Sequence, residues 1–291
     1  MSIKIENTVT LSAQQWEAVI RGMRNPKNSW HLSDSYATHI EDPETGNVAD
    51  FEYFIGENDQ KLMETLAKGG PVHAKYRRMI FAYVDIVAPL YFFKEMDTYK
   101  VGTVCNSCST MHKIQAKEFT LDDFSHEHMT SLSLANLQNT INLLNIYRNT
   151  YLYGGEDIQE DGSVRTYEPK NKDIWWQMIQ LLPSSYNQRR TYLFSYEALV
   201  GVYRWRKDHK LDEWHIFCDW IKNELPYSEL ITGECDKTVI YDYDIEIAGD
   251  VIHGEVEVPA NATKDEIRLE IMNRLDERYD MHINKRETEN G

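Results

Sequence analysis

The stretch that decides the fold is LYFFKEMDTYKVGTVCNSCSTMHK, residues 90–113. It follows residues 80–87, whose apolar run predicts a strand, and it begins inside a helix-compatible stretch at residues 88–95. The sixteen positions 97–112 hold polar side chains that are typical of a ligand-binding loop: Asp97, Tyr99, Lys100, Asn106, Ser109 and His112. We therefore expect a ligand-binding loop whose position is set by the preceding strand and helix.

Composition limits the classes of protein to consider. The chain has 291 residues, of which 42% are hydrophobic and 12% aromatic, as in a globular protein with a sizeable core. No apolar run approaches the roughly 20 residues of a membrane-spanning helix, and the N-terminus lacks the pattern of a signal peptide. We therefore expect a soluble cytoplasmic protein without a membrane partner. The net charge of −16 argues against nucleic-acid binding, although a few arginines can still hold a small anion.

Apolar periodicity predicts helices at residues 11–24, 56–70, 131–153 and 173–182. Ser12 and Gln15 form a capping-box pattern at the start of the first helix. We interpret residues 191–225 as two helices that are broken near 207–210. Residues 25–50 are expected to be irregular, and residues 154–172 are expected to form a charged loop.

The last 55 residues have a pattern of their own. Residues 239–247 and 252–258 alternate apolar and polar side chains around a turn, which predicts a β-hairpin. Residues 263–266 form a capping box before an amphipathic helix with Ile267, Ile271 and Leu275 on one side. We therefore expect a main domain at residues 1–236, a ββα appendage at 237–283 and a disordered tail at 284–291.

The four cysteines, Cys105, Cys108, Cys218 and Cys235, are too few for a disulfide framework. Cys105-x-x-Cys108 is compatible with a redox pair, with half of a zinc site that includes His112, or with small residues packed in a turn beside a ligand. Since no second pair of this spacing exists, we expect neither metal nor redox chemistry. We likewise expect the sequence 126–128, His-Glu-His, to lie on the surface without a metal.

Two arginines stand beside apolar side chains, Arg189 after Pro183 and Arg206 after Leu199, Val202 and Tyr203. A buried charge without a partner is unfavourable, so each arginine needs an anion. A phosphate suits the planar guanidinium. A salt bridge to Glu197, Asp208 or Glu213 is the alternative, and the residues alone leave both open.

Residues 69–225 resemble the core of the flavin-dependent thymidylate synthases. In that family a histidine-containing motif leads into a strand and a helix, and an Arg-His-Arg signature with Ser, Asn and Arg follows. Here His73 stands at the first family histidine, Thr98-Tyr99-Lys100 replaces Arg-His-Arg, and Asn106 and Ser109 keep the Asn-x-x-Ser spacing. Met111 replaces the final arginine.

The second part of the resemblance is LPSSYNQRRTYLFSYEALVGVYRWR, residues 182–206. Arg189 falls on the family arginine that binds the substrate phosphate, and Arg206 falls on the arginine that closes the helix. Ser195-Tyr196-Glu197 replaces the family's Asn-Ala-Arg turn.

The resemblance implies an α+β fold, in which a small antiparallel sheet is flanked by long helices. It implies binding of a pyrimidine deoxynucleotide monophosphate by Arg189, Arg206, Ser109, Asn106 and Glu95. It implies binding of flavin adenine dinucleotide (FAD) by His73, Thr98, Tyr99 and Lys100.

The activity implied is reductive one-carbon transfer to C5 of the pyrimidine, by default from dUMP to dTMP. Methylene-tetrahydrofolate and NADPH would be co-substrates, and a homotetramer would be the assembly. No catalytic side chain is needed, because the cofactor carries the chemistry. The alternative is a catalytically silent nucleotide-binding or regulatory protein of the same fold.

Overall fold

The computed structural model describes residues 3–41, 48–233, 238–247, 250–259, 267–272 and 274. The chain forms two compact units, residues 1–232 and residues 233–291. Within the described residues, each helix is too short or too polar to cross a membrane.

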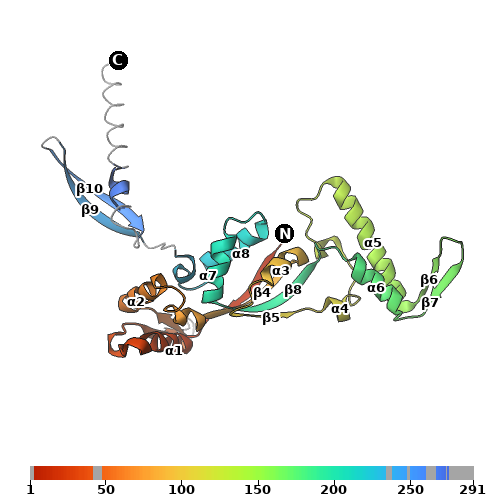
Figure 1. The fold of residues 1–291 in the computed structure, drawn as a ribbon, viewed down its shortest axis with the longest axis horizontal. Helices are drawn as coiled ribbons and strands as arrows, with labels where there is room; N and C mark the ends of the chain where they lie inside the picture. Colours follow the sequence, from red (N-terminus) through yellow and green to blue (C-terminus); the bar gives the residue numbers. More distant parts are fainter. Residues whose placement is uncertain are drawn as a thin grey trace, which may run out of the picture. The chain divides into compact units, whose positions relative to one another are not determined.

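A four-stranded antiparallel sheet organises the first unit, with strand order β1-β4-β8-β5 (Figure 1). The strands are β1 (Lys4–Val9), β4 (Phe81–Pro89), β8 (Asn187–Ser195) and β5 (Thr103–Ser107). Ala82, Val84 and Ile86 of β4 are buried, whereas Tyr83 between them is 45% exposed. Because side chains alternate along a strand, one face of the sheet is covered and the other is open.

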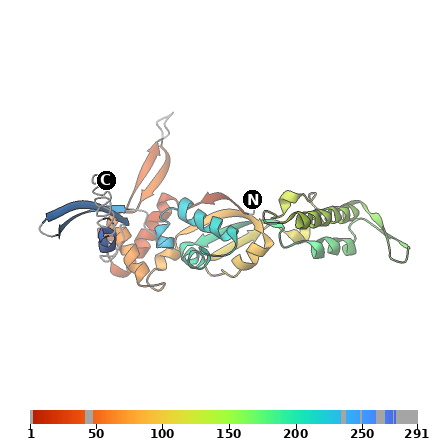
Figure 2. The same cartoon turned by 90° about the horizontal axis from the view of Figure 1, so that it is seen from above.

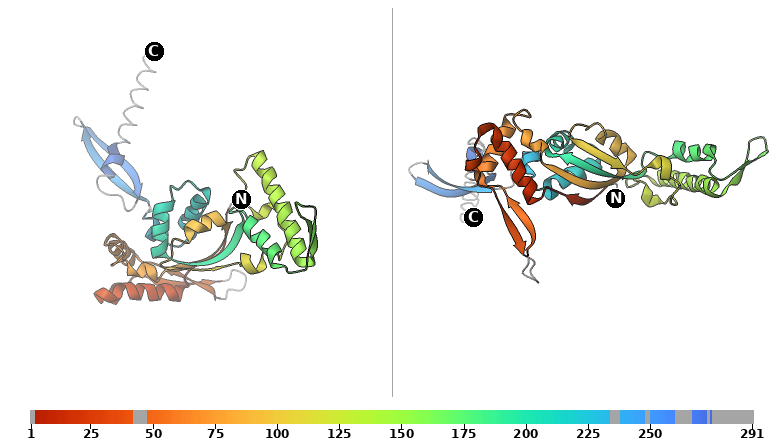
Figure 3. Two further views of the ribbon diagram at one scale, coloured as in Figure 1. Left: turned by 45° about the vertical axis from the view of Figure 1, so that its right-hand side comes forward. Right: turned by 90° about the horizontal axis from the view of Figure 1, so that it is seen from below.

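Helices α3 (Leu90–Met96), α7 (Tyr196–Arg206) and α8 (Asp212–Glu224) lie on the covered side of this sheet (Figure 3, left). The packing is aromatic: the ring centroids are 4.6 Å apart for Phe92 and Trp214, and 5.7 Å apart for Phe194 and Phe217. Each large side chain that is fully buried in this way contributes about 1.5–3 kcal/mol. The short helix α9 (Glu229–Thr232) contacts α7 at the end of this unit.

The N-terminal part of the first unit contains α1 (Ala13–Arg24) and α2 (Glu57–Lys68), with the short helical turns η1 (Asn25–Lys27), η2 (Trp30–Leu32) and η3 (Lys75–Arg78). The capping box of Ser12 and Gln15 is confirmed. Between the two helices, β2 (Tyr36–Glu41) and β3 (Val48–Phe54) form an antiparallel hairpin (Figure 3, right). A buried ion pair joins α1 to α2, because Arg24 Nε lies 2.5 Å from Asp59 Oδ1.

A second apolar core lies in the segment between β5 and β8. This segment contains α4 (Thr110–Lys113), η4 (Leu121–Asp123), α5 (Ser131–Tyr153), β6 (Gly155–Ile158), β7 (Val164–Tyr167) and α6 (Lys172–Leu181). Helices α5 and α6 run side by side (Figure 2). The buried members of this core are Ile114, Phe119, Phe124, Leu137, Ile141, Leu144 and Met178.

The second unit contains the antiparallel pair β9 (Thr238–Ile247) and β10 (Asp250–Pro259), followed by helical residues 267–272. Tyr243 and Val256 pack with Ile267 and Ile271. A Cβ at Gly254 would lie 2.5 Å from the Tyr243 ring, so glycine is required where this ring crosses the hairpin. The hairpin and the helix are confirmed, whereas the capping box at 263–266, Leu275 and the tail lie outside the described residues.

The α+β class is confirmed, but four predictions of local structure were wrong. Strands β2 and β3 occupy part of residues 25–50, and the hairpin β6–β7 occupies the expected charged loop. Residues 191–195 continue β8 instead of opening a helix, and the loop before α4 contains the edge strand β5. The reason is pairing: β8 bonds to a partner strand on both sides, and this outweighs local helix preference. Strand β1 also pairs in this sheet, next to β4, and was not among the predicted strands.

Candidate functional site

One polar cluster forms where α3 ends, α7 ends and α8 begins, and we call it the Glu95 cluster. Its members are Glu95, Tyr99, Arg206, His209 and Trp214. Glu95 Oε2 lies 2.8 Å from Arg206 Nη1, and it accepts a hydrogen bond of 3.0 Å from Trp214 Nε1. Arg206 Nε donates to Tyr99 Oη at 2.9 Å, and His209 Nε2 lies 3.4 Å from the same Glu95 oxygen.

Local sequence explains why Glu95 and Tyr99 reach this position. Helix α3 buries Phe92, Phe93 and Met96 against the core, which leaves Glu95 at the rim. The helix ends because Thr98 Oγ1 donates to the carbonyl of Glu95 at 2.7 Å and the Tyr99 N–H donates to the carbonyl of Met96 at 3.0 Å. The chain therefore turns back and brings the Tyr99 ring edge-on to Trp214, with the centroids 6.2 Å apart.

The environment of Arg206 is aromatic and half-closed. Its side chain is 18% exposed, and its guanidinium carbon lies 4.8 Å from the centroid of Trp214 and 5.5 Å from that of Tyr99. Both ring faces attract a cation, and reduced contact with water strengthens this attraction. Trp214 is fully buried, so its ring supports the guanidinium from behind, and the Arg206 guanidinium and the half-buried Tyr99 ring are the groups of the cluster that suit an anionic aromatic ligand.

Arg189 lies on the open face of the sheet. Its guanidinium is 2.6 Å from Glu6 Oε2 and 3.1 Å from Asp85 Oδ2. Hydrogen bonds from Thr191 and Asn7, and then the charge of Arg189, hold the pKa of Asp85 below its ordinary value. The hydrogen bond to Glu6 in turn raises the pKa of Arg189.

Arg189 and Arg206 are on opposite sides of the sheet within one chain. Arg190, the next residue after Arg189, stacks its guanidinium 4.0 Å from the centroid of Phe93 on α3, so it points to the covered side. Arg189 therefore points away from α3, whereas Arg206 pairs with Glu95 of α3. A single anion held by both arginines would need two copies of the chain.

From the sequence, a salt bridge of Arg189 or Arg206 to a nearby acidic residue remained an alternative to a phosphate. Neither pairs with Glu197, Asp208 or Glu213; the partners are Glu6 and Asp85 for Arg189 and Glu95 for Arg206. Glu213 instead is buried and accepts a hydrogen bond from Tyr91 Oη, which also lies 3.0 Å from Ser125 Oγ. Burial, followed by the bond to Glu213, raises the pKa of Tyr91. This buried pair had no sequence signal beyond the acidic start of α8.

The remaining predicted site residues are exposed: Asn106, Ser109 and His73 are not members of the Glu95 cluster, whereas Thr98 and Lys100 flank its Tyr99. Asn106 is exposed on β5 opposite Thr191, on the open face. Ser109 caps α4, where its Oγ accepts from the His112 N–H at 3.1 Å. His73 is exposed in the turn after α2. Thr98 and Lys100 are exposed on either side of Tyr99.

Among the described residues, the cysteines and histidines are not grouped as metal ligands. Cys105 and Cys108 are exposed thiols, Cys218 is a buried thiol whose pKa is raised to about 12 by burial, and Cys235 lies outside the described residues. His126 Nδ1 lies 2.7 Å from the carbonyl of Phe124, and His128 Nε2 lies 3.0 Å from Asp212. The described part of the chain contains no group of three or more potential metal ligands.

No family model matches the sequence, and no curated protein matches it. Among solved structures, the chain is similar to the flavin-dependent thymidylate synthase ThyX of Helicobacter pylori in complex with FAD and dUMP, with 13% identity and a TM-score of 0.47. That alignment covers 80% of this chain and 97% of the other. It is also similar to the UMP/dUMP methylase PolB of Streptomyces cacaoi bound to 5-Br UMP, with 8% identity, a TM-score of 0.45, and 80% and 93% of the two chains covered. At these values, function has to be inferred from the residues of this chain.

Proposed function

We propose that the chain binds a pyrimidine deoxynucleotide monophosphate and acts as a divergent flavin-dependent enzyme that transfers a one-carbon unit reductively to C5 of the base. One observation carries the proposal. Glu95, Tyr99 and Arg206 are distant in sequence, were assigned to substrate or flavin by the family resemblance, and meet within hydrogen-bond distance in the Glu95 cluster.

In this proposal Arg206 binds the anionic ligand through its guanidinium, and Glu95 keeps the guanidinium oriented by the 2.8 Å ion pair. Tyr99 supplies a flat ring beside the ligand, and Trp214 fixes Glu95 through its indole N–H. Arg189, Ser109 and Asn106 would complete the nucleotide site from a neighbouring copy, because they lie outside this cluster. A cytoplasmic homotetramer remains part of the proposal.

The residues fit FAD only as a site shared between chains. Lys100 is an exposed cation that suits a phosphate as a point charge, and His73 and Thr98 are exposed hydrogen-bonding groups. The Tyr99 hydroxyl, however, is already engaged by Arg206 within the same chain. When bound, FAD would supply the hydride chemistry, with methylene-tetrahydrofolate and NADPH as co-substrates.

A specific observation favours the second candidate, a nucleotide-binding protein without catalytic activity. Both arginines are neutralised by carboxylates of their own chain, and Arg189 is neutralised by two of them. The ion pairs of Arg189 have to open or rearrange before this arginine can contact a phosphate, and the Glu95 carboxylate beside Arg206 opposes the approach of a second anion. A protein that only senses a nucleotide tolerates this cost more easily than an enzyme that turns over.

The deciding experiment measures dUMP binding by calorimetry, with and without FAD, and then assays dTMP formation with methylene-tetrahydrofolate and NADPH. We expect dUMP binding that Arg206→Met weakens about tenfold to a hundredfold and that the exposed control Arg204→Met leaves unchanged. FAD at 100 times its dissociation constant should stabilise the protein by about 2.7 kcal/mol. Binding of dUMP without a stabilising effect of FAD and without product would leave the silent binder as the function, and no dUMP binding would reject both.

A further inference from the structure

Helix α5 carries apolar side chains on two opposite sides. It is the longest helix among the described residues (Figure 1), and each residue turns the helix by about 100°. One side packs Leu137, Ile141 and Leu144 into the second apolar core. The other side exposes large side chains by 37–77%: Leu132, Leu143, Ile146 and Tyr153. The core accounts for the inner side, whereas the outer side remains exposed.

The outer side follows a heptad pattern. Exposed or half-buried positions recur at alternating spacings of four and three residues, and together they form what we call the outer stripe: Leu132, Asn136, Asn139, Leu143, Ile146, Thr150 and Tyr153. This alternation is typical of a helix that pairs with a second helix. Leu143 and Ile146 are the apolar centre of the stripe, and uncharged polar residues stand on both sides of them.

The exposed side of α5 also lacks charge. Arg148 is the one charged residue among the 23 of this helix, and its Nε donates to the carbonyl of Gln115 at 3.0 Å, away from the outer stripe. At the 27% of the whole chain, about six charged residues would be expected in this length. A surface helix normally places charged side chains opposite its core-facing stripe. The outer side of α5 is therefore not an ordinary solvent-facing surface.

The lack of charge indicates the kind of partner. A nucleic acid or an anionic membrane would need lysines and arginines on this side, and a charged peptide would need charges of opposite sign. The centre of a protein–protein interface is instead depleted of charge and enriched in apolar and aromatic side chains. Two copies of this chain, each with a net charge of −16, repel one another least where both contribute an uncharged surface.

We propose that two copies of the chain pair through the outer stripe, with their α5 helices antiparallel about a two-fold axis. Leu143 of one copy then faces Ile146 of the second copy, and Asn139 faces Thr150. Apolar residues therefore meet apolar residues, and polar residues meet polar ones. The antiparallel order also places the positive end of each helix dipole beside the negative end of the other.

This pairing is independent of the proposed nucleotide chemistry. No residue of the outer stripe belongs to the Glu95 cluster or to the ion pairs of Arg189. A symmetric pair that uses the same surface of both copies is the commonest kind of protein oligomer. The pairing would hold whether or not the chain binds a nucleotide, and it would supply one of the interfaces of a larger assembly.

Size-exclusion chromatography with light scattering of the full chain measures the assembly. Leu143→Glu/Ile146→Glu places four carboxylates at the centre of the paired helices, so it should halve the mass and weaken the pairing about a hundredfold or more. Ser133→Glu/Gln138→Glu adds the same two charges at exposed positions of the same helix outside the stripe, and it should leave the mass unchanged. A wild-type chain with the mass of one copy at high micromolar concentration would overturn the proposal. Equal losses of mass in the two variants would overturn it as well.

A charge exchange tests whether the partner is another α5. Leu143→Lys/Ile146→Lys should also halve the mass, because four ammonium groups then meet. Mixing this variant with Leu143→Glu/Ile146→Glu in equal amounts should restore the wild-type mass, since lysines of one chain then face carboxylates of the other. Circular dichroism of each variant alone should match that of the wild type, because Leu143 and Ile146 lie outside the second apolar core. Two folded variants that stay at half mass after mixing would overturn the pairing of α5 with α5.

Cross-linking tests the antiparallel order, in a chain where serine replaces Cys105, Cys108 and Cys235. Asn139→Cys and Thr150→Cys lie at positions that face each other between the copies, so oxidation of a mixture of the two variants should give linked dimers. Each variant alone should stay unlinked, because identical positions are then about 16 Å apart along the helix axis. Linking of the Asn139→Cys variant to itself would overturn the antiparallel order, since parallel helices bring identical positions together.

Discussion

Arg206 and Arg189 lie on opposite sides of the central sheet, and their surroundings differ. On the covered side, Arg206 is 18% exposed, has one carboxylate partner and lies against two aromatic rings. On the open side, the Arg189 side chain is 44% exposed and contacts two carboxylates near water. The number of ion pairs is larger on the open side, but the energy of each is smaller there, because water screens exposed charges.

This contrast shows that arginines aligned with one family motif need not share a site within one chain. Arg189 and Arg206 are separated by the thickness of the sheet, so they can meet at one phosphate only if one chain supplies Arg189 and another supplies Arg206. The proposed function places the nucleotide site between chains for this reason. The open face of the sheet would then be the side on which a neighbouring chain approaches.

The largest expected effect follows from such a shared site. Arg189→Ala and Arg206→Met should each weaken dUMP binding about tenfold to a hundredfold, because each removes a charge-assisted hydrogen bond to the phosphate. If subunits exchange between the oligomers of the two variants, mixing the variants should recover about a quarter of the wild-type sites. Half of the pairs in a random mixture are mixed, and one of their two sites is then intact.

Calorimetric stoichiometry of the mixture measures this recovery. The control is each variant alone at the same total concentration, which should show no tight sites. A mixture that behaves as the average of the two variants would mean that Arg189 and Arg206 do not act together. The Arg189 assignment would then be withdrawn, while the Glu95 cluster would keep its own role.

A smaller effect distinguishes the two arginines in the folding equilibrium. Arg206→Met should lower the free energy of unfolding by about 1.5–3 kcal/mol, since Glu95 and Tyr99 both lose a half-buried partner. Arg189→Met should lower it by less than about 1 kcal/mol, because its ion pairs are exposed. Urea denaturation of both variants, with Arg204→Met as the exposed control, measures the difference. Equal losses would show that burial does not set the strength of these pairs.

Much of the fold could be predicted because its helices carry strong apolar periodicity. Helix α5 was placed with the observed bounds, and the hairpin of the second unit was placed within a few residues. Strands β1 and β5 could not be predicted, since an edge strand with few buried side chains has no clear alternation. Part of strand β8 was predicted as helix, because Tyr192, Leu193 and Phe194 are also compatible with a buried helix. Pairing with β4 and β5 on both sides makes this segment a strand.

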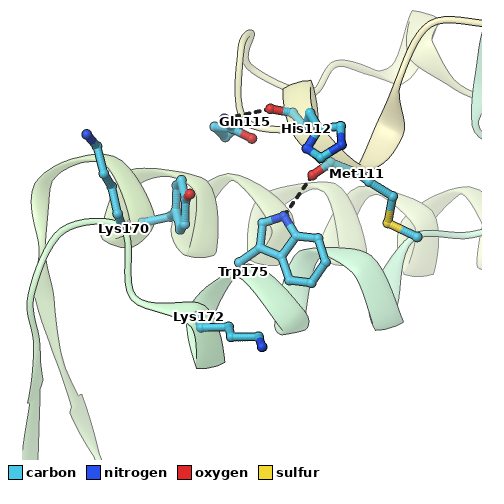
Figure 4. A pocket seen from close by; sticks show the side chains of 7 residues that line it. Met111, His112, Gln115, Lys170, Lys172 and Trp175 are labelled. Atoms are coloured by element: carbon cyan, nitrogen blue, oxygen red, sulfur yellow. Dashed lines mark hydrogen bonds between the residues drawn. The ribbon is translucent and has the colours of Figure 1, made fainter.

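The candidate site was predictable only where the chain turns locally. Glu95 lies in the last turn of α3 and Tyr99 lies in the turn that ends this helix, so their proximity follows from the local sequence. The pairing of Arg206 with Glu95 depends on how α7 packs beside α3, which no local pattern encodes. The pocket that Met111 and Trp175 help to line (Figure 4) was not predicted for a similar reason: these residues are 64 positions apart, and the hydrogen bond between them brings the two segments together.

The smallest effect concerns protonation on the open face. Hydrogen bonds from Thr191 and Asn7, together with Arg189, lower the pKa of Asp85, so the folded state binds this proton less readily than the unfolded state. The resulting stabilisation is present above the unfolded-state pKa of about 3.9 and is lost as the pH falls through the lower folded-state value. Stability should therefore fall more steeply between about pH 5 and about pH 3 in the wild type than in Asp85→Asn. Urea denaturation across this window measures both slopes.

Asp212→Asn, at the exposed partner of His128, controls for the loss of one carboxylate in general. If the two slopes were equal, the Arg189 network would contribute no pH-dependent stability to the open face of the sheet.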